Sequence, residues 1–199
     1  MAVKFQYNKT SMQIMRRQLQ IREKALPTLK SKEAALRVEV KKISDKKAEL
    51  ENSYRIILSA QESINRYWCE FPDLISVSSL KVASRKIAGI KIPILDEVNF
   101  KITDFPLFSS EAWFPEGIER IKKIITLSTE IGITEKQFIT LNYARKKTTQ
   151  KVNLYEKVQI PQFKDAIIKI KRFMEDEENL SKSSQKIVKE RNRAKEAAL

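Results

Sequence analysis

The most informative pattern in this chain is a row of apolar side chains, spaced alternately three and four residues apart, that runs from Met12 to Phe71. Fourteen of its eighteen positions are apolar. The four polar exceptions are Arg22, Glu33, Lys47 and Gln61. Heptad spacing sustained over eight repeats is typical of one helix of a coiled coil. We therefore predict one helix over about residues 9–71, which would be roughly 90 Å long.

Two features modify this first helix. Asn8 or Thr10 is a candidate N-cap, because short polar side chains accept hydrogen bonds from the first free backbone N–H groups. Pro27 removes one backbone hydrogen bond and its ring clashes with the carbonyl of Glu23. Because the apolar row keeps its phase across Pro27, we expect a kink there and not a helix end. The four polar residues in the apolar row would weaken the pairing of this helix with a partner helix, and they are candidates for fixing the register of that pairing.

A second apolar row, from Phe138 to Met174, predicts a second long helix over about residues 134–196. Gly132 and Thr134 are the expected C-cap and N-cap that separate it from the preceding segment. The row contains one five-residue step, from Tyr155 to Ile160 beside Pro161, where we expect a local kink or stutter.

The two predicted helices have equal lengths and flank a small insert, which predicts an antiparallel hairpin of helices in coiled-coil geometry. Residue numbers that face each other would then add up to about 205. The residues assigned to the coiled-coil seam are Met12, Met15, Leu19, Leu26, Leu29, Leu36, Val40, Ile43, Leu50, Tyr54, Ile57, Ile64, Val152, Tyr155, Ile160, Phe163, Ile167 and Ile170.

Residues 73–112 are rich in Val and Ile and alternate in places, which predicts short strands in a small hairpin or meander. Gly89 and the pair Asp96–Glu97 are the expected turns, and residues 116–130 are expected to form a short amphipathic helix. The predicted fold class is therefore mainly α, a long antiparallel two-helix coiled coil with a small α/β insert. The expected domains are residues 1–71, 72–132 and 133–199.

Composition supports long helices, since only three glycines and six prolines occur in 199 residues. The net charge of +14 is unevenly distributed. Residues 1–47 carry thirteen Lys and Arg against four Asp and Glu, and residues 182–199 carry six against two. In between, residues 48–144 carry eleven against thirteen. If both chain ends lie at one tip of a helical hairpin, that tip is strongly positive.

The residues contain no recognisable catalytic, metal or cofactor constellation. Histidine is absent and Cys69 is the single cysteine, which excludes an internal disulfide, a zinc site and a Cys-His nucleophile. None of the glycines belongs to a phosphate-binding loop. No run of 18 apolar residues occurs, so we expect a cytosolic or peripherally attached protein with no direct membrane insertion. On composition alone, a basic coiled-coil nucleic-acid binder or a scaffold protein is the alternative.

Two blocks of residues resemble the D subunit of the V-type and A-type rotary ATPases. The first runs from Lys9 to Leu36 and includes a Leu-Lys-x-Lys-x-x-Ala-Leu pattern. The second runs from Thr148 to Pro161 and is similar to the family's Val-Asn…Ile-Pro block, with Lys151 where many relatives have Arg. The positions that carry this second match are Val152, Asn153, Glu156, Ile160 and Pro161.

The resemblance implies a central rotor shaft without catalytic chemistry of its own. The termini would lie inside the ring of catalytic and non-catalytic nucleotide-binding subunits, and the insert would point to the membrane-embedded ring through a funnel-shaped adaptor. The small F subunit of the rotor would bind alongside, and no nucleic acid or cofactor is implied. We expect Arg16, Arg17 and Lys24 to contact the hexamer, and the complex to hold the chain at the inner face of the membrane.

Overall fold

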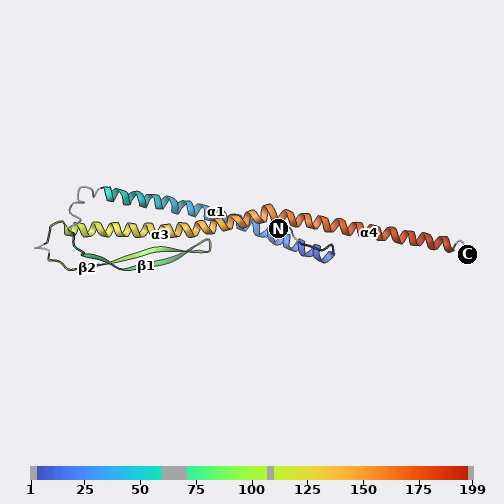
Figure 1. The fold of residues 1–199 in the computed structure, drawn as a ribbon, viewed down its shortest axis with the longest axis horizontal. Coiled ribbons are helices and arrows are strands. Elements are labelled where there is room, and N and C mark those ends of the chain that lie inside the picture. The colour runs from blue at the N-terminus through green and yellow to red at the C-terminus, as the bar shows by residue number, and fades with distance from the viewer. Residues whose placement is uncertain (1–3, 60–70, 107–109, 197–199) are drawn as a thin grey trace. The chain divides into compact units, whose positions relative to one another are not determined.

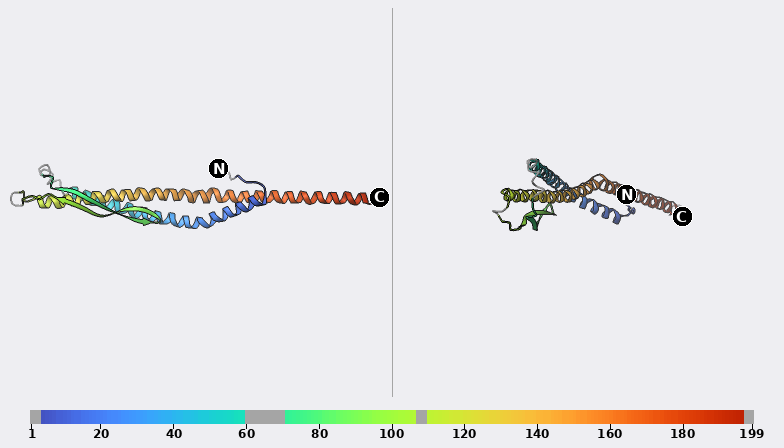
Figure 2. Two further views of the ribbon diagram at one scale, coloured as in Figure 1. Left: turned by 90° about the horizontal axis from the view of Figure 1, so that it is seen from below. Right: turned by 60° about the vertical axis from the view of Figure 1, so that its left-hand side comes forward.

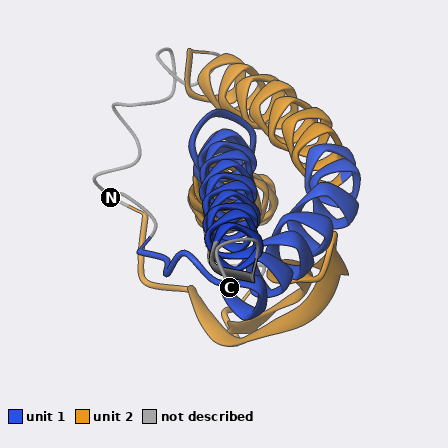
Figure 3. Ribbon diagram, turned by 90° about the vertical axis from the view of Figure 1, so that its right-hand side faces the viewer, with its two compact units in different colours: residues 1–31, 148–199 blue, residues 32–147 orange. Residues whose placement is uncertain are grey.

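The computed structural model describes residues 4–59, 71–106 and 110–196, and it divides into two compact units. Unit 1 consists of Met1–Ser31 and Thr148–Leu199, and unit 2 consists of Lys32–Lys147 (Figure 3). The elements, in chain order, are the helix α1 (Lys9–Ser59), the strands β1 (Ile75–Ile87) and β2 (Ile90–Ile102), the helix α3 (Phe114–Asn153), the π-helix η1 (Leu154–Gln159) and the helix α4 (Ile160–Glu196) (Figure 1).

The first predicted helix is confirmed over most of its length. Asn8 is its N-cap, because the Asn8 side-chain oxygen accepts a hydrogen bond of 2.6 Å from the backbone N–H of Ser11. The helix continues through Pro27, as the unbroken phase of the apolar row predicted. The predicted seam residue Ile64 and the end of the helix lie outside the described residues, and Phe71 is no longer helical.

Unit 2 is built on α1, α3 and the hairpin of β1 and β2, which lies along α3 (Figure 2). Its core joins all three parts, and the buried members are Leu36, Ile43, Ile92 and Leu141. Lys46 pairs with Glu130 at 2.7 Å and Lys47 pairs with Glu135 at 3.2 Å, which link α1 to α3. The hydrogen bond from Lys47 to Glu135 raises the pKa of Lys47 above its usual value.

The predicted hairpin is confirmed, but its strands are longer than expected. Each has 13 residues, and they pair antiparallel across a turn at Ala88 and Gly89. The predicted turn at Asp96–Glu97 is wrong, because both residues lie within β2. Lys81 faces Glu97 and Val82 faces Leu95, which leaves Asp96 as the additional residue of a bulge. A short polar stretch that is typical of a turn can therefore lie within a strand, where a bulge accommodates it.

The hairpin turn contains a position where glycine should be better than the natural residue. Ala88 has φ of 49°, in the left-handed region that costs an alanine about 1 kcal/mol. We expect Ala88→Gly to stabilise the chain by up to about 1 kcal/mol in urea denaturation, whereas Ala83→Gly, within β1, should destabilise it by a similar amount. A lower stability for Ala88→Gly would contradict this view of the turn.

The predicted break between a short helix and a second long helix is wrong. α3 is continuous from Phe114 to Asn153 and passes through Gly132 and Thr134. Gly132 does not have positive φ, so it does not end the helix as a left-handed C-cap would. Ile133 and Thr134 are buried, and the packing of this segment overrides the cost of about 1 kcal/mol for a glycine inside a helix.

Unit 1 pairs the first part of α1 antiparallel with η1 and α4. Its core consists of Met15, Phe163 and Ile170. Glu23 pairs with Lys164 at 3.1 Å and Lys30 pairs with Glu156 at 2.6 Å. The numbers in these pairs add up to 187 and 186, so the predicted total of about 205 is wrong. This error of 18 to 19 positions is close to the 20 positions between the expected helix start at residue 134 and the observed start of α3 at Phe114.

The last part of α4 extends beyond the start of α1, within the same unit (Figure 1). All side chains from residue 175 to residue 194 are exposed, including Leu180, Ile187 and Val188. The prediction that this segment is helical is confirmed. Among the described residues, no helix combines the length and the apolar character that crossing a membrane requires.

Candidate functional site at the π-helical segment

The described seam residues face the interior of the helical pairing. Each of them is buried or partly buried, with Leu36 and Ile170 fully buried. Apolar residues of α1 outside the seam are exposed instead, with Ile14, Ile21 and Val38 each about half accessible. The heptad row therefore marks the buried face of α1, and the opposite face is open to solvent.

The residues that carry the family resemblance surround one unusual segment of unit 1. Val152 and Asn153 end α3, Glu156 lies within η1, and Ile160 and Pro161 begin α4. The backbone N–H of Ile160 donates to the carbonyl of Tyr155, a five-residue step. This step matches the five-residue gap in the apolar row, so the predicted irregularity is confirmed and takes the form of a π-helix. The missing N–H of Pro161 removes one regular backbone hydrogen bond at the same place.

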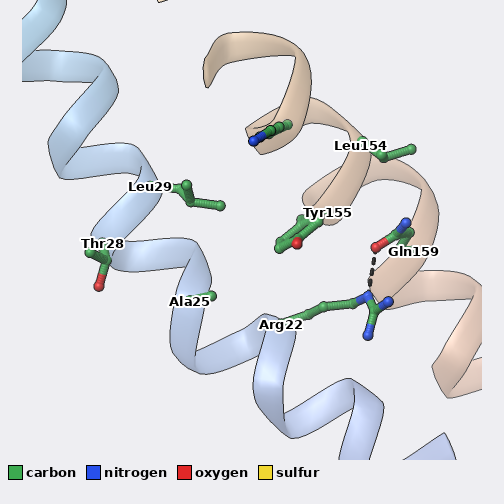
Figure 4. Close-up of a pocket in the computed structure, with 8 residues that line it drawn as sticks. Arg22, Ala25, Thr28, Leu29, Leu154, Tyr155 and Gln159 are labelled. Carbon is green, nitrogen blue, oxygen red and sulfur yellow. Dashed lines mark hydrogen bonds between the residues drawn. The ribbon is translucent and has the colours of Figure 1, made fainter. Parts of the chain in front are cut away.

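Arg22 of α1 lies opposite η1 and, like the Lys30–Glu156 pair, makes a polar contact between the two helices at this level (Figure 4). Its Nε donates to Oε1 of Gln159 at 2.6 Å. One terminal nitrogen donates to the backbone carbonyl and the side-chain oxygen of Gln18, at 3.0 and 2.6 Å. The guanidinium also lies 4.6 Å from the ring centre of Phe163 and 5.8 Å from that of Tyr155.

An open groove of about 590 Å³ separates α1 from η1 beside Arg22. The residues that line it are Arg22, Ala25, Thr28, Leu29, Lys151, Leu154, Tyr155 and Gln159. Two of them are basic and none is acidic. The groove offers hydrogen-bond donors and apolar surface, which suit binding and positioning. No group of three or more metal-ligating side chains occurs in the described part of the chain.

The three residues expected to contact the hexamer all lie on the exposed surface of α1 in unit 1. Arg16, Arg17 and Lys24 form no hydrogen bond or ion pair with another described residue. The structure therefore leaves their charges available, and their contact with a partner stays a prediction. The sequence did not identify Gln159 at all, and it marked Arg22 only as a polar exception within the seam.

Two long antiparallel helices, one of them with a π-helix, and a β-hairpin packed on them define a helical-hairpin protein. The family model for the D subunit of ATP synthase matches residues 11–190. This chain belongs to that family.

Three relatives, each named as the D subunit of a V-type ATP synthase, illustrate the range of similarity. The protein from Borreliella burgdorferi is 31% identical over 196 residues and covers 94% of both chains. The protein from Chlamydia pneumoniae is 25% identical over 189 residues and covers 88% of this chain and 87% of its own. The protein from Thermotoga neapolitana is 24% identical over 133 residues, with 63% and 64% covered.

Proposed function

We propose that this chain is the central rotor shaft of a V-type ATP synthase and carries torque between the nucleotide-binding hexamer and the membrane ion-translocating ring. Membership of the D-subunit family is the observation that carries the proposal. The antiparallel helices of unit 1, joined by a buried apolar seam and by ion pairs between α1 and α4, support it. In this role the chain performs no chemistry itself.

The proposal assigns different partners to the chain termini and to the insert. The basic termini, which belong to unit 1, enter the ring of catalytic and non-catalytic nucleotide-binding subunits. The insert, with the hairpin, points to the membrane-embedded ring through a funnel-shaped adaptor, and the small F subunit binds alongside. The proposal also includes the division of the chain into residues 1–71, 72–132 and 133–199. It further includes the attachment of the whole complex to the inner face of the membrane, which would hold this chain there peripherally.

Electrostatic attraction explains how such a shaft could rotate inside the surrounding ring of subunits. Exposed Lys and Arg side chains attract acidic surfaces over several ångströms without needing a fixed apolar contact. A shaft held in this way has no single fixed contact and is free to rotate, whereas a large apolar interface would fix one orientation. The net charge of +14 is consistent with a shaft held by electrostatic attraction to acidic surfaces.

Rotation of the chain during ATP hydrolysis tests the proposal directly. A bead attached at the β1–β2 turn of the assembled, surface-fixed complex should turn in one direction when ATP is added. Three pauses per revolution are expected if the hexamer has three catalytic sites. A hexamer that hydrolyses ATP while the bead stays still would refute the proposal.

A charge reversal tests the expected contact with the hexamer. Changing Arg16, Arg17 and Lys24 together to Glu should weaken assembly about tenfold or more, because these exposed charges are lost and replaced by repulsive ones. The free energy of unfolding should change by less than about 1 kcal/mol, since exposed charges contribute little to stability. Affinity for the purified hexamer and urea denaturation measure the two effects.

A matched control separates position from net charge. Lys32, Lys41 and Lys136 are also exposed and lie in unit 2. Their reversal to Glu changes the net charge by the same amount and should reduce assembly much less. Equal losses for both triple variants would mean that only net charge matters and that the three selected residues make no specific contact.

A further inference from the structure

Within unit 1, both helices are irregular at the same level. Pro27 interrupts the hydrogen bonding of α1, and η1 and Pro161 interrupt that of the facing helix. The ion pairs Glu23–Lys164 and Lys30–Glu156 lie on either side of Pro27, which places Pro27 opposite residues 156–164. Two weak points that face each other allow a local opening that a single one would not, because an intact partner helix would hold its neighbour straight.

The packing is also open at this level. The groove of about 590 Å³ lies between Ala25, Thr28 and Leu29 on α1 and the residues of η1. None of the six residues of η1 is buried. Few buried contacts and many accessible backbone groups are the features of a segment that opens at low free-energy cost. Beyond this segment, by contrast, Phe163, Ala166 and Ile170 are buried.

Arg22 bridges this loosely packed level through one row of side chains. Tyr155, Gln159 and Phe163 are each four residues apart and all contact Arg22. A four-residue step turns through slightly more than one full turn in an α-helix, with 3.6 residues per turn, and through slightly less in a π-helix. The two deviations offset each other, so the π-helix brings all three side chains into line. An unbroken α-helix would spread them over about 80° of its surface.

We propose that Arg22 and η1 form a latch, a contact that keeps this level of unit 1 closed and η1 in its π-helical form. When the latch opens, η1 loosens while the core around Met15, Phe163 and Ile170 stays folded. An apolar residue would satisfy the seam at position 22, as it does at Leu19 and Leu26. A partly buried arginine with several directed hydrogen bonds instead provides specificity of geometry. The inference concerns the chain itself and is independent of the torque proposal.

Hydrogen exchange on the full chain tests the latch. Arg22→Met keeps most of the side-chain volume and removes the hydrogen bonds. The amides of residues 155–162, apart from Pro161, which has no amide hydrogen, should then exchange about tenfold faster, because charge-assisted hydrogen bonds are lost. Amides of residues 165–172 should change by less than about twofold, since the core around them stays folded. Arg22→Lys keeps the charge but loses the planar fork and should resemble Arg22→Met.

Two outcomes would overturn the proposal. Unchanged exchange of residues 155–162 in Arg22→Met would show that Arg22 does not hold η1. An equal acceleration throughout 155–172 would show that Arg22 only contributes to general stability. Arg17→Met, a change at an exposed arginine of the same helix, is the control and should leave both groups of amides unaffected.

A second background makes the test specific for the π-helix. Deleting Lys157, an exposed residue of η1, removes the additional residue of the π-helical turn. With regular α-helical hydrogen bonds restored, this segment no longer depends on Arg22 to stay closed, so Arg22→Met should have less than about a twofold effect on exchange in that background. An effect of about tenfold that persists after the deletion would show that Arg22 acts independently of the π-helix.

Discussion

Replacing Leu36 with Ala is expected to lower the free energy of unfolding by about 3 kcal/mol, because removal of a fully buried leucine leaves a cavity. Leu36 is 0% exposed and packs with Ile43, Ile92 and Leu141, which come from α1, β2 and α3. The change therefore weakens contacts among all three parts of unit 2 at once. Urea denaturation followed by circular dichroism measures the loss.

The control for this prediction lies two residues away on the same helix. Val38 is 53% exposed, so Val38→Ala should change the free energy of unfolding by less than about 0.5 kcal/mol. The two variants share the same element and the same replacement residue. Similar losses for both would mean that the heptad row does not mark the buried face of α1.

Two single-residue deletions are expected to have opposite outcomes. Deleting Lys169, within the regular part of α4, turns all following residues by about 100° relative to the preceding ones. Ile170, which is fully buried, would leave its contact with Met15, at a cost of about 2–5 kcal/mol. Deleting Lys157 removes the additional residue of the π-helix and leaves α3 and α4 in phase, so stability should change by less than about 1 kcal/mol.

Thermal and urea denaturation of the two deletion variants measure this difference. Both variants lose one exposed lysine, so charge and length are matched. A large destabilisation by the Lys157 deletion would mean that the π-helix supports the fold of unit 1. In that case the residues of η1 would support the fold of unit 1 in addition to forming the latch with Arg22.

The sequence predicted those features that depend on local periodicity. The heptad row identified the buried face of α1, and the five-residue step from Tyr155 to Ile160 located η1. The glycine at position 89 located the hairpin turn, because glycine tolerates the positive φ that the turn requires. Each of these signals lies within a few residues of the feature that it specifies.

Features that depend on long-range packing were not predictable in the same way. Gly132 and Thr134 form a convincing helix boundary in sequence, yet the burial of Ile133 and Thr134 keeps α3 continuous. That single error displaced the register of the helical pairing. The contact of Arg22 with Gln159 joins residues 137 positions apart, so no local pattern could reveal it.

The bulges of the hairpin have a consequence for how the chain behaves at high concentration. Both strands are edge strands of a two-stranded sheet, so each has an outer edge that this sheet does not pair and that a second hairpin could use as a template. Register shifts next to Ser79 and Lys81 interrupt that template twice, and Pro93 lacks the N–H that a neighbour would need. These interruptions oppose the stacking of hairpins from different chains into intermolecular sheets and fibrils.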